Sequence, residues 1–525
     1  MQLSLRALVV FAVVGLNLLW VSSLQAIDFE TVALAGQPAP GAPSQFFRNF
    51  NAPLIDDEGR VAFQGDLNSS NDNAIWSGDP GALQLVARKN KPAPGTNANF
   101  STFDGFNTFS DLLIDGSGTV SFEAGLSRPP ADLTNHIGIW SGPATSLSLA
   151  ARKGSSAPGT SQTYFQFMNH NVLSSSGRLS FAGVESNGRG GIWTGLPGQL
   201  QLLAETSQTP SLGPFKSLSA SQPSINSVGT TAFRAVLWDN SWESIWIGTP
   251  GQLQRVASQS APAAGFGPSS QYGGLFSHPA INNAGQITFA GSASNVGNVI
   301  WAGAANSLQP IAVQGQTAPQ TGGSTFAIFL DPIINSAGDV AFRASLTGGG
   351  SASSPDGIWV HADGSSHGVA LKSTHAPGLA SGVNFSGFNE PTLNGLGQVA
   401  FTATLSGPGV NSSNDVGLFA TDVLGKLTLL AREGAPFEVS PGTFRTISTV
   451  NGLGGAFFHL PSGGEDGRPQ VFNDAGQLAF SLTFTNSTAG VFVAEVPEPA
   501  AIALAGLGLA GFVVSGWRRK RRGYS

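Results

Sequence analysis

The stretch Asn394-Gly-Leu-Gly-Gln-Val-Ala-Phe401 recurs in altered form along almost the whole chain. In each copy a glycine lies four residues before a phenylalanine, and a polar residue that favours turns lies three residues before the glycine. A polar side chain at the first position of a type I turn can bond its own backbone, and glycine is favoured at the fourth position. The apolar run that follows, such as Val61-Ala-Phe63, is typical of a strand. The motif therefore predicts a turn followed by a strand.

Eight copies of this motif follow one another at intervals of 52 to 59 residues, except for a last interval of 79. The turn residues are Asp56, Asp115, Ser174, Asn226, Asn282, Asn335, Asn394 and Asn473. The phenylalanines are Phe63, Phe122, Phe181, Phe233, Phe289, Phe342, Phe401 and Phe480. A second aromatic residue follows 12 to 18 residues later: Trp76, Trp140, Trp193, Trp246, Trp301, Trp359, Phe419 and Phe492. An apolar alternation and a proline-containing turn, as at residues 83–87 and 93–95, complete the unit.

Each unit thus offers about four short strands, which is the pattern of a β-propeller blade. The ends of the body are incomplete in matching ways. Residues 31–41 resemble the last strand and turn of a unit, whereas residues 490–494 form an aromatic strand with no such element after it. We therefore predict an all-β, eight-bladed β-propeller closed by the N-terminal strand, because closure removes exposed sheet edges. A β-solenoid, the alternative, would need capped ends.

One region departs from this schedule. Asn451-Gly-Leu-Gly-Gly-Ala-Phe-Phe458 fits the motif but lacks the elements that should follow it, and a polar loop with Glu465, Asp466 and Arg468 precedes the next copy. We expect a surface hairpin inserted into the eighth blade. The alternatives are an insertion on a binding face and a different blade register.

Composition limits the classes of protein that need to be considered. Hydrophobic residues make up 41% of the chain, which excludes extended disorder, and the absence of cysteine excludes disulfides and thiolate metal sites. The net charge is −6, but six basic residues lie in the terminal segments. Without them, residues 27–499 hold 19 basic and 31 acidic residues, a net charge of −12. An acidic body argues against nucleic acid as a partner.

Residues 1–26 have the pattern of a secretory signal peptide. Arg6 precedes an apolar run at residues 7–20, which is too short to span a bilayer comfortably. Small residues then lead to a predicted cleavage site after Ala26. An uncleaved anchor helix is the alternative.

The C-terminal segment, residues 496–525, has three parts. Pro497, Glu498 and Pro499 precede residues 500–517, which carry no charge. A helix of that length covers about 27 Å, close to the ~30 Å hydrocarbon core of a bilayer. A basic stop follows, formed by Arg518, Arg519, Lys520, Arg521 and Arg522. We predict a transmembrane sorting helix in the inner membrane, with the basic end cytoplasmic and the body, residues 27–495, outside.

Together these three parts resemble the PEP-CTERM sorting signal of Gram-negative and related bacteria. The resemblance implies an exosortase, a membrane-embedded processing enzyme, as a partner that acts near residues 497–499. It also implies transfer to the cell surface or release, often in bacteria that make exopolysaccharide. The body is similar, over roughly residues 30–495, to proteins described as choice-of-anchor tandem repeat, NxxGxxAF-containing. Asp56, Asp115 and Ser174 depart from the asparagine of that motif, and the family carries no established activity to transfer.

No catalytic, cofactor-binding or metal-binding constellation stands out in the sequence. The seven histidines fall in different repeats without ligand spacing, and no HExxH, GxSxG or Walker-type loop is present. Neutral turn residues in most copies argue against cation loops. Arg88, Arg152 and Arg432 recur at one repeat position, and we expect edge-strand charges there, with an anion-binding rim as the alternative. We expect the scheduled tryptophans to pack inside blades rather than to stack on sugars.

The sequence therefore predicts an exported, surface-sorted, non-enzymatic β-propeller without a cofactor. It would bind or organise extracellular matrix or exopolysaccharide through loops on one face. A glycan-active propeller enzyme, a hydrolase or a lyase, is the alternative, and a purely structural role is the third possibility. A cluster of carboxylates at the channel mouth would favour the enzyme, whereas a bland channel would favour the binder.

Overall fold

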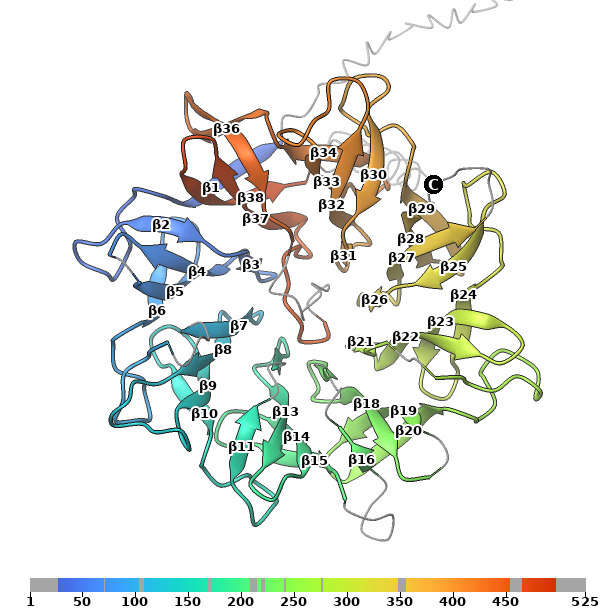
Figure 1. The fold of residues 1–525 in the computed structure, drawn as a ribbon, viewed down its shortest axis with the longest axis horizontal. Coiled ribbons are helices and arrows are strands. Elements are labelled where there is room, and N and C mark those ends of the chain that lie inside the picture. The colour runs from blue at the N-terminus through green and yellow to red at the C-terminus, as the bar shows by residue number, and fades with distance from the viewer. Residues whose placement is uncertain are drawn as a thin grey trace, which may run out of the picture.

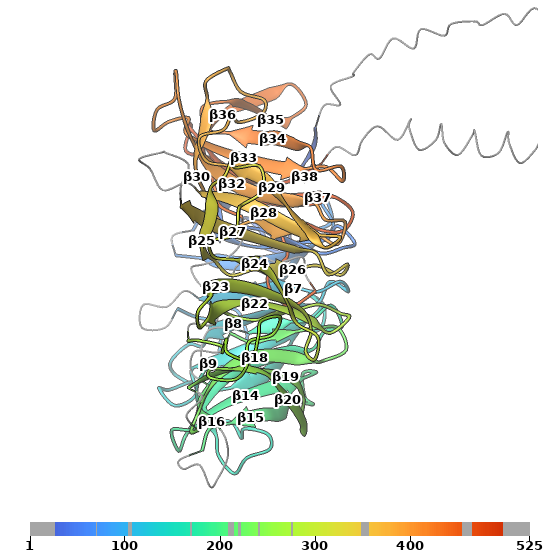
Figure 2. The ribbon, with the colours of Figure 1, turned by 90° about the vertical axis from the view of Figure 1, so that its right-hand side faces the viewer.

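The computed structural model describes residues 27–496, apart from residues 70, 103–107, 168–170, 208–214, 219–221, 240–241, 275–276, 348–355 and 454–464. The described chain forms eight antiparallel sheets arranged as blades around a central axis (Figure 1). Seen from the side, the ring is thinner than it is wide (Figure 2). The predicted all-β, eight-bladed β-propeller is confirmed. The predicted terminal helices lie outside the described residues, and within those residues no helix is both long and apolar enough to cross a bilayer.

Each of the first four blades follows the predicted motif. The first blade contains β2 (Phe47–Phe50), β3 (Leu54–Ile55), β4 (Val61–Leu67), β5 (Asn73–Gly78) and β6 (Gln84–Arg88). The second contains β7 (Phe109–Ile114), β8 (Val120–Gly125), β9 (Ile137–Gly142) and β10 (Ser148–Arg152). The third contains β11 (Tyr164–Phe167), β12 (Val172–Leu173), β13 (Leu179–Glu185), β14 (Gly190–Gly195) and β15 (Gln201–Glu205). The fourth contains β16 (Phe215–Ser217), β17 (Ser224–Ile225), β18 (Thr231–Leu237), β19 (Glu243–Thr249) and β20 (Gln252–Ser258).

The remaining blades repeat this order, and the last one also takes in the start of the body. The fifth blade contains β21 (Ala280–Ile281), β22 (Gln286–Ala293), β23 (Gly297–Ala304) and β24 (Gln309–Val313). The sixth contains β25 (Thr325–Phe329), β26 (Ile333–Ile334), β27 (Val340–Thr347), β28 (Asp356–Ala362) and β29 (Ser365–Leu371). The seventh contains β30 (Asn384–Phe388), β31 (Thr392–Leu393), β32 (Val399–Ser406), β33 (Val416–Thr421) and β34 (Leu427–Arg432). The eighth contains β35 (Pro436–Ser440), β36 (Thr443–Val450), β37 (Gln477–Phe484), β38 (Ala489–Glu495) and β1 (Asp28–Leu34).

The N-terminal strand closes the ring, as predicted. β1 pairs antiparallel with β38 from Asp28 opposite Glu495 to Leu34 opposite Gly490. The side chain of Thr31 also donates to the carbonyl oxygen of Val439 in β35, at 2.8 Å. The first and last strands of the body therefore share one sheet, although more than 450 residues separate them.

The motif phenylalanine and the scheduled aromatic residue lie directly opposite each other in all eight blades, as Phe63 and Trp76 do in the first. The rings of that pair are stacked, with centroids 5.9 Å apart. Trp76 is fully buried, and its indole nitrogen donates to the carbonyl oxygen of Pro40 in the preceding proline turn, at 2.9 Å. The same pair packs against Ala479 and Val491 of the eighth blade. The scheduled tryptophans therefore pack the blades together, as predicted.

Strand direction gives the ring two unlike faces. We call the side that holds the eight motif turns, at residues 56–59 and their equivalents, the asparagine face. The opposite side holds the connections between the second and third long strands, such as residues 68–72, and we call it the loop face. Glu495 pairs with both Asp28 and Gln477, and Gln477 follows the eighth motif turn directly. The described body therefore begins and ends at the asparagine face.

Candidate functional site

The motif turns form a ring of hydrogen bonds around the central axis. In five consecutive blades the asparagine side-chain nitrogen donates to the backbone oxygen of the equivalent residue in the next blade. These bonds run from Asn226 to Asn282 (3.1 Å), Asn282 to Asn335 (2.9 Å), Asn335 to Asn394 (3.0 Å), Asn394 to Asn473 (2.9 Å) and Asn473 to Asp56 (2.9 Å). The motif residue therefore links neighbouring blades.

The same amide also shapes its own turn. The Oδ1 atom of Asn394 accepts the backbone N–H of Gln398 at 2.9 Å, and the motif glycine Gly397 has a φ of 78°. This left-handed conformation favours glycine and confirms the predicted turn chemistry. An amide supplies both an acceptor for the turn and a donor for the next blade, whereas serine or aspartate cannot do both in the same way. The donor role is the part that the sequence analysis missed.

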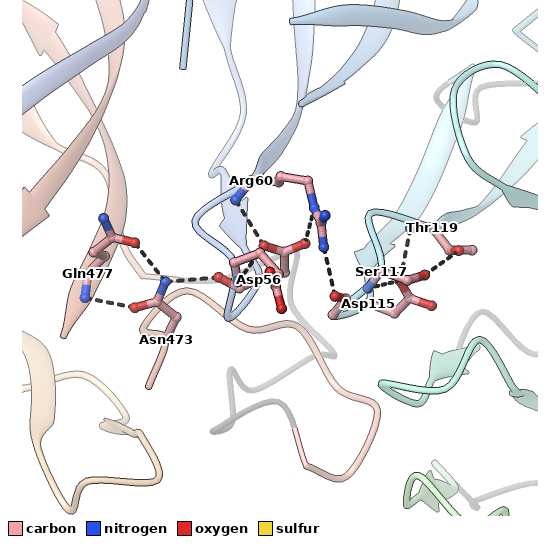
Figure 3. Close-up of polar contacts among 9 residues, drawn as sticks. Asp56, Arg60, Asp115, Ser117, Thr119, Asn473 and Gln477 are labelled. Carbon is pink, nitrogen blue, oxygen red and sulfur yellow. Dashed lines mark hydrogen bonds and ion pairs between the residues drawn. The ribbon is translucent and has the colours of Figure 1, made fainter. Parts of the chain in front are cut away.

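Where the motif departs from asparagine, another side chain makes the link (Figure 3). Asp56 accepts the Nε atom of Arg60 at 2.7 Å, and the Nη2 atom of Arg60 donates to the carbonyl oxygen of Gly116 in the second blade, at 2.7 Å. In the third blade the hydroxyl of Ser176 donates to the carbonyl oxygen of Ser227, at 2.6 Å. The departures therefore preserve a contact between blades as well as the turn.

The insertion in the eighth blade crosses the channel, so the expectation of a surface hairpin is wrong. Its described part runs toward the centre of the ring between β36 and β37 (Figure 1). Its backbone oxygens accept N–H groups of three other blades: Ile55 to Gln470 (2.9 Å), Leu173 to Gly467 (2.8 Å) and Ile225 to Asp466 (2.8 Å). The Arg468 side chain, only 3% exposed, donates to the carbonyl oxygen of Pro279 of the fifth blade at 2.8 Å. The insertion therefore fills part of the channel and ties four blades together.

Carboxylates lie at this end of the channel, but backbone and amide donors occupy them. Glu465 accepts the N–H and the side-chain nitrogen of Asn283, at 2.9 and 2.8 Å. Asp474 accepts the N–H of Gly395, and Asp57 accepts the side chain of Gln470 at 2.6 Å. Burial raises the pKa of Glu465 and of Asp474, and neighbouring carboxylates raise both further. Within the described ranges, no group of three or more histidine, aspartate or glutamate side chains is arranged to hold a metal ion.

A second acidic pair lies between strands of the second blade. Burial, and then the charge of Asp111, raises the pKa of Glu123 to about 8. A carboxyl group that is protonated at neutral pH is a feature of acid catalysts. Glu123, however, is only 8% exposed, so a polymer cannot reach it in this conformation.

The loop face carries a group of exposed aromatic side chains, which we call the loop-face aromatics: Phe46, Phe165, Trp242 and Phe444. They are 42%, 54%, 62% and 60% exposed. The large exposed side chains of the asparagine face, Val228, Leu396, Val423 and Leu424, are aliphatic instead. Exposed aromatic rings gathered on one side of a molecule indicate a binding surface.

Lysines accompany two of these rings. The Nζ atom of Lys216 lies 5.4 Å from the ring centroids of both Trp238 and Trp242, and the Nζ atom of Lys153 lies 5.1 Å from that of Phe165. Such cation–π contacts hold ring and ammonium group side by side. The sequence analysis missed these residues, although Trp238 and Trp242 gave a signal: neither falls at the scheduled position.

The recurring arginines are tied to connections within their own blades. Arg88 pairs with Asp72 at 2.6 Å, and the Nε atoms of Arg152 and Arg432 donate to the backbone oxygens of Asn135 and Asn414, both at 2.8 Å. All three lie in the outermost strand of a blade, as expected of edge-strand charges.

The predicted sorting residues Pro497, Glu498 and Pro499, the basic stop at residues 518–522 and the cleavage site at Ala26 lie outside the described residues. Comparison with known families bears on this part of the chain. A family model described as "Family of unknown function (DUF7453)" matches residues 14–107 and 102–503. The chain belongs to this family. Residues 495–521 match the PEP-CTERM protein-sorting motif, which implies processing by an exosortase, export and sorting to the cell surface. No curated protein matches the chain.

Solved structures share only distant similarity with this family member. One is the β-propeller domain of the Trilobed protease from Pyrococcus furiosus, with 11% identity, coverage of 74% of this chain and 100% of that chain, and a TM-score of 0.38. Another is a puromycin-hydrolysing peptidase of Mycobacterium tuberculosis, with 12% identity, coverage of 87% and 62%, and a TM-score of 0.39. A third is an oligogalacturonate lyase in complex with manganese, with 10% identity, coverage of 90% and 97%, and a TM-score of 0.36. At these scores the similarity carries no argument, and the fold assignment rests on the strand order.

Proposed function

We propose that this exosortase-sorted propeller binds extracellular polysaccharide through its loop face and takes no part in catalysis. The observation that carries the proposal is the set of loop-face aromatics, above all Trp242 with Lys216 beside it. The face of an aromatic ring packs against the C–H groups of a sugar, and an ammonium group donates to sugar hydroxyls or carboxylates. The acidic body limits the positive charge available, so stacking contributes more than charge.

The arrangement favours a polymer over a single sugar. The four rings belong to the first, third, fourth and eighth blades, so no one pocket gathers them. Each ring alone binds weakly, but a chain that contacts several gains affinity by 10²- to 10⁴-fold, as an order of magnitude, through effective concentration. A matrix polymer meets this condition, whereas a short oligosaccharide does not.

The channel supports the same proposal. The insertion occupies it with backbone bonds, and the carboxylates at its mouth accept bonds from neighbouring blades. The alternative, a hydrolase or lyase, would have to use Glu123 and Asp111, so one experiment should measure both binding and cleavage.

The test uses the secreted chain and purified bacterial exopolysaccharides, with co-sedimentation for binding and release of reducing or unsaturated sugar ends for cleavage. We expect binding without cleavage, at least tenfold weaker binding for Trp242→Ala and Phe165→Ala, and no change for Leu424→Ala on the other face. Equal binding by all variants would contradict the proposed surface. Sugar release that Glu123→Gln abolishes would establish the enzyme instead.

The ends of the chain complete the proposal. We propose cleavage of the signal after Ala26 and exosortase action at residues 497–499. The inner membrane would hold the apolar segment, residues 500–517, until that step. A tail with Glu498→Ala that leaves the mature mass unchanged in the native host would contradict this assignment.

A further inference from the structure

The described body ends close to where the apolar tail segment begins. The backbone N–H of Val496 donates to the carbonyl oxygen of Gly476, at 2.9 Å, so the chain is still held at the asparagine face there. Only residues 497–499 separate Val496 from the apolar run at residues 500–517. Three residues span at most about 11 Å when extended. While the tail is in the membrane, the asparagine face near the eighth blade must therefore lie next to the lipid surface.

The seventh blade, beside this exit, presents apolar side chains on the same face. Val423 and Leu424 form the tip of the turn between β33 and β34, and Leu424 is 77% exposed. The turn is held from within, because the Asp422 Oδ1 atom accepts the N–H groups of Leu424 and Lys426, both at 2.9 Å. Leu396, at the motif turn of the same blade, is 49% exposed. In a capped turn these side chains cannot withdraw into the core, so they remain available to a partner.

The charges near the exit indicate what kind of surface this partner offers. Asp28 and Glu495 lie opposite each other in β1 and β38, and their charges, after burial, raise the pKa of Glu30. Three carboxylates at this place disfavour an anionic surface, and Lys426 is the exposed cation in the turn itself. An apolar contact with little dependence on salt is what these groups allow.

We infer that the asparagine face of the seventh blade rests on the bilayer before processing, with Val423 and Leu424 inserted among the lipid headgroups. The loop face then points away from the membrane, toward the polymer. This contact holds the chain at residues 497–499 at a fixed height above the membrane, where a membrane-embedded exosortase works. The inference rests on the sorting motif and does not depend on polysaccharide binding.

The test uses the full chain in phosphatidylcholine vesicles, with flotation as the check that the tail has inserted. Because the chain has no cysteine, Leu424→Cys carries a single environment-sensitive fluorophore, and Leu133→Cys on the loop face is the matched control. We expect the label at 424 to shift to shorter wavelength, to be quenched several-fold by lipids with a headgroup nitroxide, and to resist iodide at both low and high salt. The label at 133 should be open to iodide.

Equal iodide quenching at the two positions in floated vesicles would overturn the inference. Because labelling changes only an exposed side chain, unchanged melting temperatures exclude misfolding as the cause. A second variant, Leu424→Glu, should slow tail processing several-fold in the native host relative to Leu133→Glu. Equal processing rates would contradict the positioning role.

Discussion

Replacing Asn473 with aspartate tests the asparagine ring. Asn473 is fully buried, its Nδ2 atom donates to the oxygens of Asp56 and Gln477, both at 2.9 Å, and its Oδ1 atom accepts the N–H of Gln477 at 2.8 Å. Aspartate keeps the acceptor but removes both donated bonds and turns a charged oxygen toward two other oxygens. Two lost bonds and a buried, unpaired charge together cost about 3–5 kcal/mol at pH 7.

The first blade suggests how to rescue this variant. There, Asp56 occupies the asparagine position, and Arg60, four residues later, supplies the missing donor. Gln477 holds the same position relative to Asn473, so adding Gln477→Arg to Asn473→Asp should recover much of the loss. Calorimetric melting is the assay, and Asn411→Asp is the control, because the exposed Asn411 uses its Oδ1 atom to cap a loop.

In acid the Asn473→Asp side chain takes up a proton and regains one donor, so the difference from the parent should shrink. A melting temperature equal to that of the parent at pH 7 would refute the reasoning, since the amide donor would then be dispensable. So would a double variant less stable than Asn473→Asp alone.

Three further predictions concern packing, the motif turns and closure. Trp193→Ala should cost about 3–5 kcal/mol, because a fully buried indole and its bond to Pro158 are lost; a loss below 1 kcal/mol in denaturant melts would contradict the role in blade packing. Gly395→Ala should destabilise by about 1–3 kcal/mol, because its Cβ would overlap the Asp474 carboxylate, whereas Gly452→Ala, with open space around it, should not. Burial and then the charges of Glu495 and Asp28 raise the pKa of Glu30, so the folded state gains stability as pH falls through that raised pKa. Glu30→Gln should therefore melt higher than the parent at pH 7 and equal to it near pH 4; a lower melting temperature at pH 7 would show the reverse sign.

The fold could be predicted because its signals are local and repeated. Phe63 and Trp76 lie 13 residues apart in sequence and opposite each other in the sheet, and this relation recurs in every blade. The matching deficits at residues 31–41 and 490–494 were enough to predict closure, because a missing strand at one end was complemented at the other.

The contacts at the centre could not be predicted, because their partners come from different blades. Asn394 and Asn473 lie 79 residues apart, and turn chemistry alone explained each asparagine. The insertion looked like a polar surface loop, since Asp466 and Arg468 are seldom buried, yet both lie in the channel. The loop-face aromatics escaped notice because the motif pattern does not tell which end of a strand reaches the surface. The residues of the sorting signal, by contrast, were identified from sequence order, and they lie outside the described structure.

Hydrogen exchange of β1 tests the closed ring most directly. Residues 28–34 pair with residues 490–495 in one sheet, so the amides of both segments should exchange slowly and become exposed together as denaturant is raised. Peptide-resolved mass spectrometry can follow the two segments in the same sample. Exchange of residues 28–34 within seconds, with residues 489–495 still protected, would mean that the N-terminal strand does not close the ring.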